Sequence, residues 1–497
     1  MSANINQNNR KLLLEISKKG RIGTTLPFCD VPKTPLPEET LLRDDLNLPE
    51  VTESQLIRYF TTLSQLNFSI DTNFYPLGSC TMKYNPKLND EIAALPGFSN
   101  IHPLQDVETV QGALKIMYYL QDFLAEITGM KATSLSPLAG AEGELAGMLM
   151  IKQYHIDNND SERNTVLIPD SAHGTNPASA TMAGFKVVTL KSDHHGNIDI
   201  SELNKHLNDK LAAAMITLPS TLGIFDKNIV EICSKIHNHG GLIYGDGANL
   251  NALLGKIKLG ALGFDVVHSN LHKTFSTPHG GGGPGSGPVM VNEKLIKYLP
   301  TPLITKTIKE NNSEFYDLVN TNNTTIGSLG TFHGNFGLLL RAYIYIRLLG
   351  RQGISNISDD AILNANYIKA KLENILDLPF ARTCMHEVVF SAKTLKTKYG
   401  ITALDIAKRL IDYNIHPPTM YFPLIVEEAL MIEPTESETK ETLDFFIDVI
   451  KEIVLDAKNN PNILLSAPHT AANRRLDEAK AARNPDLRFT RKNHTNT

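Results

Sequence analysis

Between about residue 101 and residue 333, short apolar strands alternate with amphipathic helices. In one example, a helix with Ile229, Cys233 and Ile236 on one face precedes an apolar strand at Leu242. Apolar runs of this kind are typical of strands in a parallel sheet, and the connecting helices cover the faces of that sheet. The alternation therefore predicts an α/β fold with a mostly parallel sheet in a large domain spanning 101–333.

The two ends of the chain differ from this central region. Residues 1–100 are predicted to form an N-terminal extension or arm, with a helix that has Leu56, Phe60 and Leu63 on one face. Residues 334–497 are predicted to form a smaller C-terminal α+β domain and a tail. With 497 residues, 42% hydrophobic and 20% charged, the chain can bury a large core and should form more than one domain.

The pattern that most directly indicates an enzymatic reaction is a lysine followed by a glycine-rich loop. Lys273 follows a predicted buried strand at 264–268 and precedes the glycine-rich stretch 278–285. An imine-forming lysine must be held at a strand end and partly desolvated, so that its amine is neutral often enough to attack a carbonyl. The pattern is typical of the Schiff-base lysine of a pyridoxal phosphate enzyme, and the alternative is an ordinary surface lysine.

An aspartate upstream of Lys273 supports the same interpretation. Asp246 ends an apolar strand at 241–246, and its carboxylate could keep a pyridinium nitrogen protonated, which makes the cofactor an electron sink. A turn aspartate between two glycines is the alternative. The 27 positions from 246 to 273 fit one strand–helix–strand step, so the pair with Lys273 carries more weight than either residue alone.

Two further stretches predict contacts to the same cofactor. Small residues at 136–144 open a helix, whose free amides at Gly140, Ala141 and Glu142 suit a phosphate. The glutamates compete with a phosphate there, and they could instead stabilise the first helical turn. His173 follows another apolar strand and could stack on the pyridine ring, or it could be a buried core histidine.

Long motifs carry a family resemblance. They lie at 73–86, 269–285, 334–337, 384–387, 416–423, 432–436, 467–470 and 474–478. From about Gly20 to about Pro485, the chain resembles glycine decarboxylase, the P-protein of the glycine cleavage system, in its two-polypeptide form, and there it resembles subunit 2. Leu218 and Ser220 depart from the family pattern and receive no binding role, and the role of His333 stays open.

The resemblance implies a fold and a reaction. The fold is type I of the pyridoxal phosphate enzymes, aspartate-aminotransferase-like, with the cofactor between domains. The reaction is the decarboxylation of glycine, which releases carbon dioxide and transfers the aminomethyl group to the lipoyl arm of the H-protein. Such an enzyme is a glycine dehydrogenase of the aminomethyl-transferring kind.

The resemblance also implies roles for individual residues. Lys273 would bind pyridoxal phosphate, Asp246 would face the ring nitrogen, and His173 and Ala248 would lie on opposite faces of the ring. His272 would assist proton transfer. The other implied cofactor contacts are Gly140, Ala141, Glu142, Ser269 and Thr221.

The segment from Tyr75 to Lys83 is the predicted local contribution to a substrate or lipoyl channel. Its candidate residues are Tyr75, Ser79, Cys80, Thr81 and Lys83. A structural loop is the alternative for the segment, and a packed thiol is the alternative for Cys80. No metal site is predicted, because the spacing of His268 and His272 lacks a nearby third ligand.

Composition and the resemblance together predict the cellular location and the partners of the protein. The formal charge of −5 and a pI near 6.4 give no reason to expect nucleic acid. Four cysteines without CxxC spacing, no apparent signal peptide and no membrane span predict a cytoplasmic protein without disulfides. The resemblance implies a homologous subunit 1, with two copies of each subunit, a lipoylated H-protein, and indirect links to the T- and L-proteins.

Two other functions stay open from the residues. One is a different fold type I enzyme, such as an aminotransferase or a cysteine desulfurase, although no motif marks the arginine that an aminotransferase needs for its substrate carboxylate. The other is a non-catalytic assembly subunit, which would need neither Asp246 nor Lys273.

Overall fold

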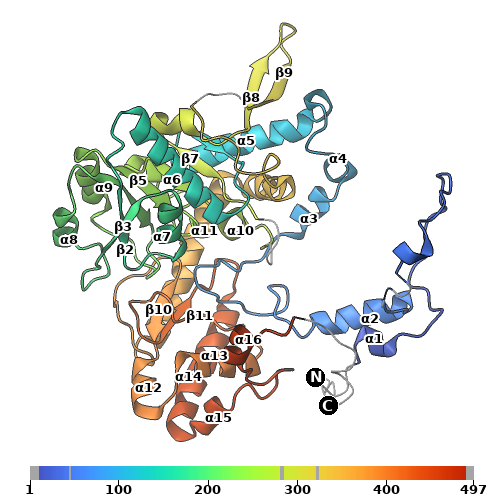
Figure 1. Cartoon of the computed structure of the whole chain (residues 1–497). Coiled ribbons are helices and arrows are strands. Elements are labelled where there is room, and N and C mark those ends of the chain that lie inside the picture. The colour runs from blue at the N-terminus through green and yellow to red at the C-terminus, as the bar shows by residue number, and fades with distance from the viewer. Residues whose placement is uncertain (1–10, 44–45, 47, 280–284, 321–323, 488–497) are drawn as a thin grey trace. The chain divides into compact units, whose positions relative to one another are not determined.

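The computed structural model describes residues 11–43, 46, 48–279, 285–320 and 324–487 (Figure 1). By its contacts the chain divides into two compact units, one formed by Met1–Ser69 with Pro468–Thr497 and the other by Ile70–Ala467. The division predicted at residues 100 and 333 stays a prediction.

The first unit consists of short helices and extended chain. Its α-helices are α1 (Leu13–Ile16), α2 (Glu53–Ser64) and α16 (Glu478–Arg483). Helix α2 is the helix predicted around Leu56, and it begins with a capping box between Thr52 and Gln55. Phe60 and Leu63 on α2 are exposed.

The second unit is built on a seven-stranded sheet with the strand order β1-β7-β6-β5-β4-β2-β3. The strands are β1 (Ala132–Ser134), β2 (Thr165–Pro169), β3 (Lys186–Leu190), β4 (Leu211–Thr217), β5 (Leu242–Asp246), β6 (Val266–His268) and β7 (Val289–Val291). Strands β3, β2, β4, β5 and β6 are parallel, and β7 pairs antiparallel with both β6 and β1. The predicted mostly parallel sheet is confirmed.

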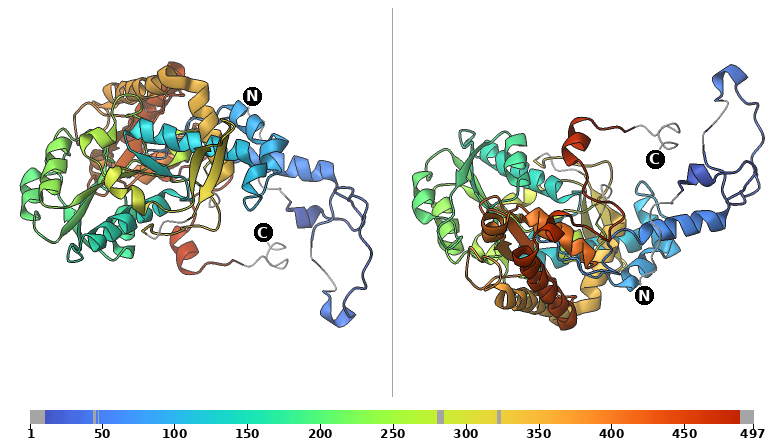
Figure 2. Two further views of the ribbon diagram at one scale, coloured as in Figure 1. Left: turned by 90° about the horizontal axis from the view of Figure 1, so that it is seen from above. Right: turned by 90° about the horizontal axis from the view of Figure 1, so that it is seen from below.

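Side chains of these strands alternate between two hydrophobic clusters, one on each face of the sheet. On β5, Ile243 packs into a cluster with α5 (Gln111–Thr128), α9 (Ile229–Asn238) and α11 (Phe336–Leu372). Leu242 and Tyr244 pack into a cluster with α6 (Gly140–Asp157) and α7 (Thr175–Met182). The green and yellow strands accordingly run between helices in both views of Figure 2. The second unit is therefore a three-layer α/β structure.

Helices and a hairpin surround the sheet. The helices are α3 (Lys87–Ala93), α4 (Pro96–Ser99), α5 (Gln111–Thr128), α6 (Gly140–Asp157), α7 (Thr175–Met182), α8 (Ile200–Lys205), α9 (Ile229–Asn238), α10 (Leu271–Thr274) and α11 (Phe336–Leu372). The hairpin consists of β8 (Leu303–Ile308) and β9 (Glu314–Val319). Gly350 interrupts α11 with non-helical dihedral angles.

A smaller α+β region follows α11. Its antiparallel sheet has the order β10-β12-β11, formed by β10 (Val388–Ser391), β11 (Thr419–Met420) and β12 (Ala429–Ile432). Helices α12 (Lys393–Tyr399), α13 (Ala403–Asp412), α14 (Lys440–Asn459) and α15 (Asn462–Leu465) complete it. One cluster that includes Phe390, Ile432 and Phe446 forms its core. Among the described helices, none is both long and apolar enough to cross a membrane.

Candidate active site

A cavity of about 260 Å³ collects most of the predicted site residues. The segments that follow β2, β4, β5 and β6 all reach it, as expected for ligand sites at the carboxyl ends of parallel strands. The predicted residues that line the cavity are Lys273, Asp246, His173, His272, Ala248, Gly140, Ala141, Thr221 and Ser79. Glu142, Ser269, Tyr75, Cys80, Thr81 and Lys83 are not among its lining residues.

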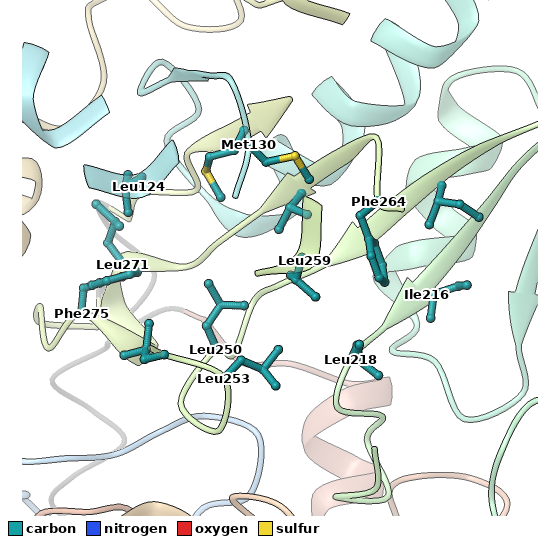
Figure 3. Close-up of a cluster of buried hydrophobic side chains, with 14 of the residues drawn as sticks. Leu124, Met130, Ile216, Leu218, Leu250, Leu253, Leu259, Phe264, Leu271 and Phe275 are labelled. Carbon is teal, nitrogen blue, oxygen red and sulfur yellow. The ribbon is translucent and has the colours of Figure 1, made fainter. Parts of the chain in front are cut away.

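Lys273 lies on α10, which starts three residues after β6 ends. Its neighbours Leu271 and Phe275 are almost completely buried in the hydrophobic cluster of Figure 3, and the hydroxyl of Thr274 accepts a 2.8 Å hydrogen bond from the amide of Leu250. Because Leu271, Thr274 and Phe275 are held by these buried contacts, the backbone of Lys273 is fixed while its side chain reaches the cavity.

Asp246 is buried at the end of β5, with 5% of its surface exposed. The amide of Ala248 donates to Oδ1 at 3.0 Å, and the hydroxyl of Thr217 lies 3.4 Å from Oδ2. Turned so that its amide nitrogen faces the carboxylates, Asn176 donates to Asp246 Oδ2 at 3.2 Å and to Glu144 Oε2 at 2.9 Å. Asp246 is thus oriented by several donors.

Two other ionisable groups lie around Asp246, and the sequence assigned a role to neither. Burial and the charge of Asp246 raise the pKa of Glu144 to about 8. Burial lowers the pKa of His268 to about 4, while its Nε2 lies 3.8 Å from Asp246 Oδ1 and its Nδ1 contacts the hydroxyl of Tyr244. Buried ionisable groups with shifted pKa values therefore gather at this end of β5, which is typical of functional sites.

The two predicted histidines of the site are neutral near pH 7. Burial, and then the charge of Lys273, lower the pKa of His173, whose ring centre lies 5.7 Å from that of Phe422. Burial and the neighbouring His279 lower the pKa of His272 to about 3. A neutral imidazole has an unprotonated ring nitrogen that can accept a hydrogen bond, and neither residue is an imidazolium acid near pH 7.

The start of α6 offers free amides to a ligand. The first amides of a helix have no intrahelical acceptor, and Ala139 at the N-cap provides no side-chain cap. A Cβ atom at Gly140 would lie 2.2 Å from Asn270 Oδ1, so only glycine permits this approach. The buried hydroxyls of Ser269, Thr277 and Ser286 have no hydrogen-bond partner among the described residues.

These amides and hydroxyls have the chemistry that a phosphate requires. The side chain of Glu142 instead accepts a hydrogen bond from the amide of Leu138, in agreement with the alternative that it stabilises the first turn. Residues 280–284 of the predicted glycine-rich loop lie outside the described residues.

The segment 73–86 contributes one wall residue and several structural contacts. Ser79 lines the cavity. Tyr75 stacks on His416 with ring centres 3.6 Å apart, and burial raises the pKa of the Cys80 thiol. Lys83 is buried and pairs with Glu436 at 2.8 Å, so its ammonium has a structural ion pair. The role of the segment from Tyr75 to Lys83 in a substrate or lipoyl channel stays a prediction.

The second wall of the cavity includes His386 and Glu387, which precede β10. The family motif at 384–387 contained both residues, yet no local pattern indicated that they face Lys273. Among the described residues that line the cavity, none is an arginine. The paired histidines considered as metal ligands lie on different elements, His268 on β6 and His272 on α10.

Comparisons with known proteins agree on one family. Residues 357–469 match the family model "Glycine dehydrogenase, C-terminal domain". A protein of Bacillus cytotoxicus named "Probable glycine dehydrogenase (decarboxylating) subunit 2" is 54% identical over 97% of this chain and 98% of its own length. A protein of the same name from Caldanaerobacter subterraneus is also 54% identical, over 97% of this chain and 99% of its own.

Solved structures agree on the fold. A crystal structure of glycine decarboxylase, the P-protein of the glycine cleavage system, in an inhibitor-bound form, matches with a TM-score of 0.71 at 19% identity, covering 84% of this chain and 93% of that one. A cysteine desulfurase from Thermococcus onnurineus matches with a TM-score of 0.59 at 16% identity, covering 78% of this chain and 95% of that one. The predicted type I fold is confirmed.

Proposed function

The chain belongs to the family of glycine dehydrogenase (decarboxylating) subunit 2, and on this premise we propose that it is the catalytic subunit of a glycine cleavage P-protein. It decarboxylates glycine, releases carbon dioxide and transfers the aminomethyl group to the lipoyl arm of the H-protein. The observation that carries the proposal is the position of Lys273 and Asp246 in one cavity beside the open start of α6.

The residues of the cavity fit pyridoxal phosphate. The free amides of α6 suit the phosphate, Lys273 supplies the amine, and the buried Asp246 can hold a proton at the ring nitrogen. When bound, the cofactor supplies an electron sink for the pair of electrons that the departing carboxylate leaves behind.

Neighbouring side chains would orient the substrate and move protons. His173 and Ala248 line the cavity on separate segments, after β2 and β5, and are proposed to hold the ring between them. Neutral His272, adjacent to Lys273, is proposed to assist proton transfer by accepting a hydrogen bond from the lysine amine or the substrate amine. Thr221 and Ser79 complete the proposed contacts to cofactor and substrate.

The cavity gives no support to an aminotransferase. Such an enzyme needs a cation for the carboxylate that its substrate retains, and the described lining residues include no arginine. A decarboxylase releases that carboxylate, so a cavity without a guanidinium fits its chemistry.

The family name also bears on partners. Relatives named subunit 2 imply a separate subunit 1, and we propose an assembly with two copies of each. The first unit exposes many large apolar side chains between residues 22 and 63, including Leu26 at 80% and Phe28 at 93%, which suits burial against another chain. The lipoylated H-protein would be the second partner, and the T- and L-proteins would act on its product. The four unpaired cysteines favour a cytoplasmic setting.

Release of labelled carbon dioxide from carboxyl-labelled glycine tests the proposal. We expect release by the protein with pyridoxal phosphate, its partner subunit and lipoylated H-protein, and none with H-protein that lacks the lipoyl group. Lys273→Ala should abolish both the visible cofactor band and the release, because the imine can no longer form. Lys258→Ala, which removes an exposed lysine paired with Glu126, is the matched control.

Two results would contradict the proposal in different ways. A colourless wild-type protein saturated with pyridoxal phosphate would remove this chain as the cofactor subunit. A yellow protein that releases no carbon dioxide in any mixture would point to another fold type I reaction.

A further inference from the structure

Glu387 and Glu433 face each other at the end of the small sheet. Val388 on β10 pairs with Ile432 on β12, and the two glutamates occupy the next position of this antiparallel ladder. They are 1% and 0% exposed, and their carboxylate oxygens and a ring nitrogen of His386 all lie within 4.8 Å of one another. Two like charges directly opposite on a sheet and buried from solvent are unfavourable unless a proton or a cation intervenes.

A strained loop supplies hydrogen bonds to this pair. Ser79 and Thr81 have φ angles of 64° and 52°, in the left-handed region that residues other than glycine rarely adopt. In this conformation the amide of Ser79 donates to Glu387 at 2.7 Å, and the amide of Thr81 donates to Glu433 at 3.0 Å. Strain of this kind persists where the surrounding structure requires it, which occurs most often at functional sites.

The donors are divided unequally between the two carboxyl groups. Glu433 accepts from the amide of Thr81, from its hydroxyl at 2.8 Å and from Asn249 at 2.9 Å. Glu387 accepts from Ser79 alone among the hydrogen bonds of the described residues. Donors favour the charged form of a carboxyl group, so a proton on one member of this pair belongs on Glu387, which has fewer donors.

The groups around Glu387 agree with this assignment. Burial and then Glu433 raise the pKa of Glu387 well above its ordinary value, while Lys273 acts in the opposite direction. The other titratable neighbours are His386, whose pKa burial lowers, and Cys80, whose pKa burial raises. Both are therefore neutral near pH 7, and neither replaces the missing positive charge.

A metal ion is the competing occupant, because His386, Glu387 and Glu433 are residue types that bind metals. Against it, three hydrogen bonds already engage the oxygens of Glu433. The Nε2 atom of His386 lies 3.8 Å from Glu387 and neither ring nitrogen has a hydrogen-bond partner among the described residues, so the ring faces the carboxyl pair without a bond to it. A proton on Glu387 removes the like-charge repulsion without a further ligand.

Glu387 also lines the cavity that holds Lys273, whereas Glu433 does not. The only other glutamate among the described lining residues, Glu144, is engaged with Asn176 and Thr175 beside Asp246. His173 and His272 are neutral at pH 7, so neither is an imidazolium acid. A proton donor on the wall formed by the small sheet therefore has to be Glu387.

We propose that Glu387 is a catalytic acid, which donates its proton to the sulfur released when the lipoyl disulfide is cleaved. The inference rests on the proposed function. The bond between the α-carbon and the carboxylate of glycine breaks, and its electron pair forms a C–S bond to one sulfur. The S–S bond breaks, its electron pair stays on the second sulfur, and that sulfur takes the proton of Glu387. The α-carbon is oxidised, the disulfide is reduced, and a proton from solvent restores Glu387.

The first test compares Glu387→Gln with wild type in the complete system of holoenzyme, partner subunit and lipoylated H-protein. The amide cannot supply an acidic proton, so we expect labelled carbon dioxide release to fall by about 100-fold or more, with the visible cofactor band retained. The control is Glu428→Gln, a buried glutamate immediately before β12 that pairs with Lys396 outside the cavity.

The second test changes the leaving group. A free aryl disulfide releases a thiolate of low pKa that needs no proton, so it should reduce the deficit of Glu387→Gln at least tenfold relative to wild type. A deficit of equal size with both disulfides would show a structural role and overturn the proposal. Release within threefold of wild type with the lipoyl substrate would also overturn it.

The third test remains informative if Glu387→Gln fails to fold. Glu433→Gln removes the like charge that raises the pKa of Glu387, so the loss of activity at high pH should move to lower pH. Unchanged pH dependence would contradict the proposal. Where Glu387→Gln folds, its infrared spectrum should contain one protonated carboxylic acid fewer than that of wild type, while the signal of Glu144 remains. Stoichiometric metal in the purified holoenzyme would overturn the proton assignment. Wild type that releases no carbon dioxide would instead refute the proposed function.

Discussion

At the scale of single residues, the site depends on carboxyl groups whose protonation is set by their neighbours. Asp246 and Glu144 share the amide of Asn176, and Glu387 and Glu433 share the donors of one loop. In each pair one member carries the charge and the other has a raised pKa, a pattern that separates acid and base roles in enzymes. The protonation of each of these carboxyl groups therefore depends on the second carboxyl group of its pair.

Replacement of Glu144 by glutamine should flatten the pH dependence of stability. The ordinary pKa of 4.5 rises to about 8 in the folded protein. Between these values the folded state keeps a proton that the unfolded state has lost, so the free energy of unfolding decreases as the pH rises, by at most about 1.4 kcal/mol per pH unit. Thermal unfolding of the cofactor-free protein across this range should show a smaller slope for Glu144→Gln.

The control for that measurement is Glu142→Gln on the same helix, which should leave the slope as in wild type. Equal slopes for wild type and Glu144→Gln would contradict the proton assignment at Glu144.

At the scale of elements, the segment 73–86 joins the small sheet to the cavity. Its Leu77 forms a bridge with Ile432 at the end of β12, and the hydroxyl of Thr419 on β11 donates to the carbonyl of Gly78. The next residues, Ser79 and Thr81, then reach the two glutamates. The docking of this segment on β12 thus determines where its donors point.

Gly78→Ala should therefore reduce stability and activity together. The new Cβ would lie 2.2 Å from Met431 Cγ and 2.5 Å from the carbonyl oxygen of Met431, so the segment must move. Overpacking of this kind costs about 1–3 kcal/mol, to be measured by denaturant unfolding. Gly97→Ala on α4 meets no atom within 4 Å and should be neutral or slightly stabilising. Equal effects of the two substitutions would show that the close approach of Gly78 is unimportant.

At the scale of the whole molecule, the two units differ in how they bury apolar surface. The second unit has continuous hydrophobic clusters on both faces of its large sheet and beneath its small sheet. The first unit leaves Ile22, Leu26, Phe28 and Leu36 each more than three-quarters exposed. A segment of this composition gains stability by packing against another chain, in agreement with the proposed partner subunit.

The double substitution Leu26→Asp and Phe28→Asp should weaken assembly with the partner subunit at least tenfold. Both side chains are exposed in this chain, so their loss should leave its melting temperature nearly unchanged. Sedimentation of the mixed subunits would measure the assembly. Thr25→Asp adds a charge at an exposed neighbouring position without removing apolar surface, and should assemble as wild type does. Undiminished assembly of the double variant would exclude this part of the arm from the interface.

The sequence by itself determined those features that depend on neighbours along the chain. The alternation of apolar runs specified the parallel sheet, and the strand ends at Asp246, His173 and Lys273 could be placed because carboxyl ends of parallel strands meet at one edge. Only the tertiary structure decided which distant charges meet. The antiparallel register of β10 and β12 brings Glu387 and Glu433 together. Lys83 forms an ion pair with Glu436, which is distant from it in the sequence. Local patterns specify secondary structure, whereas pairing of buried charges depends on packing between segments, which no periodicity in the sequence encodes.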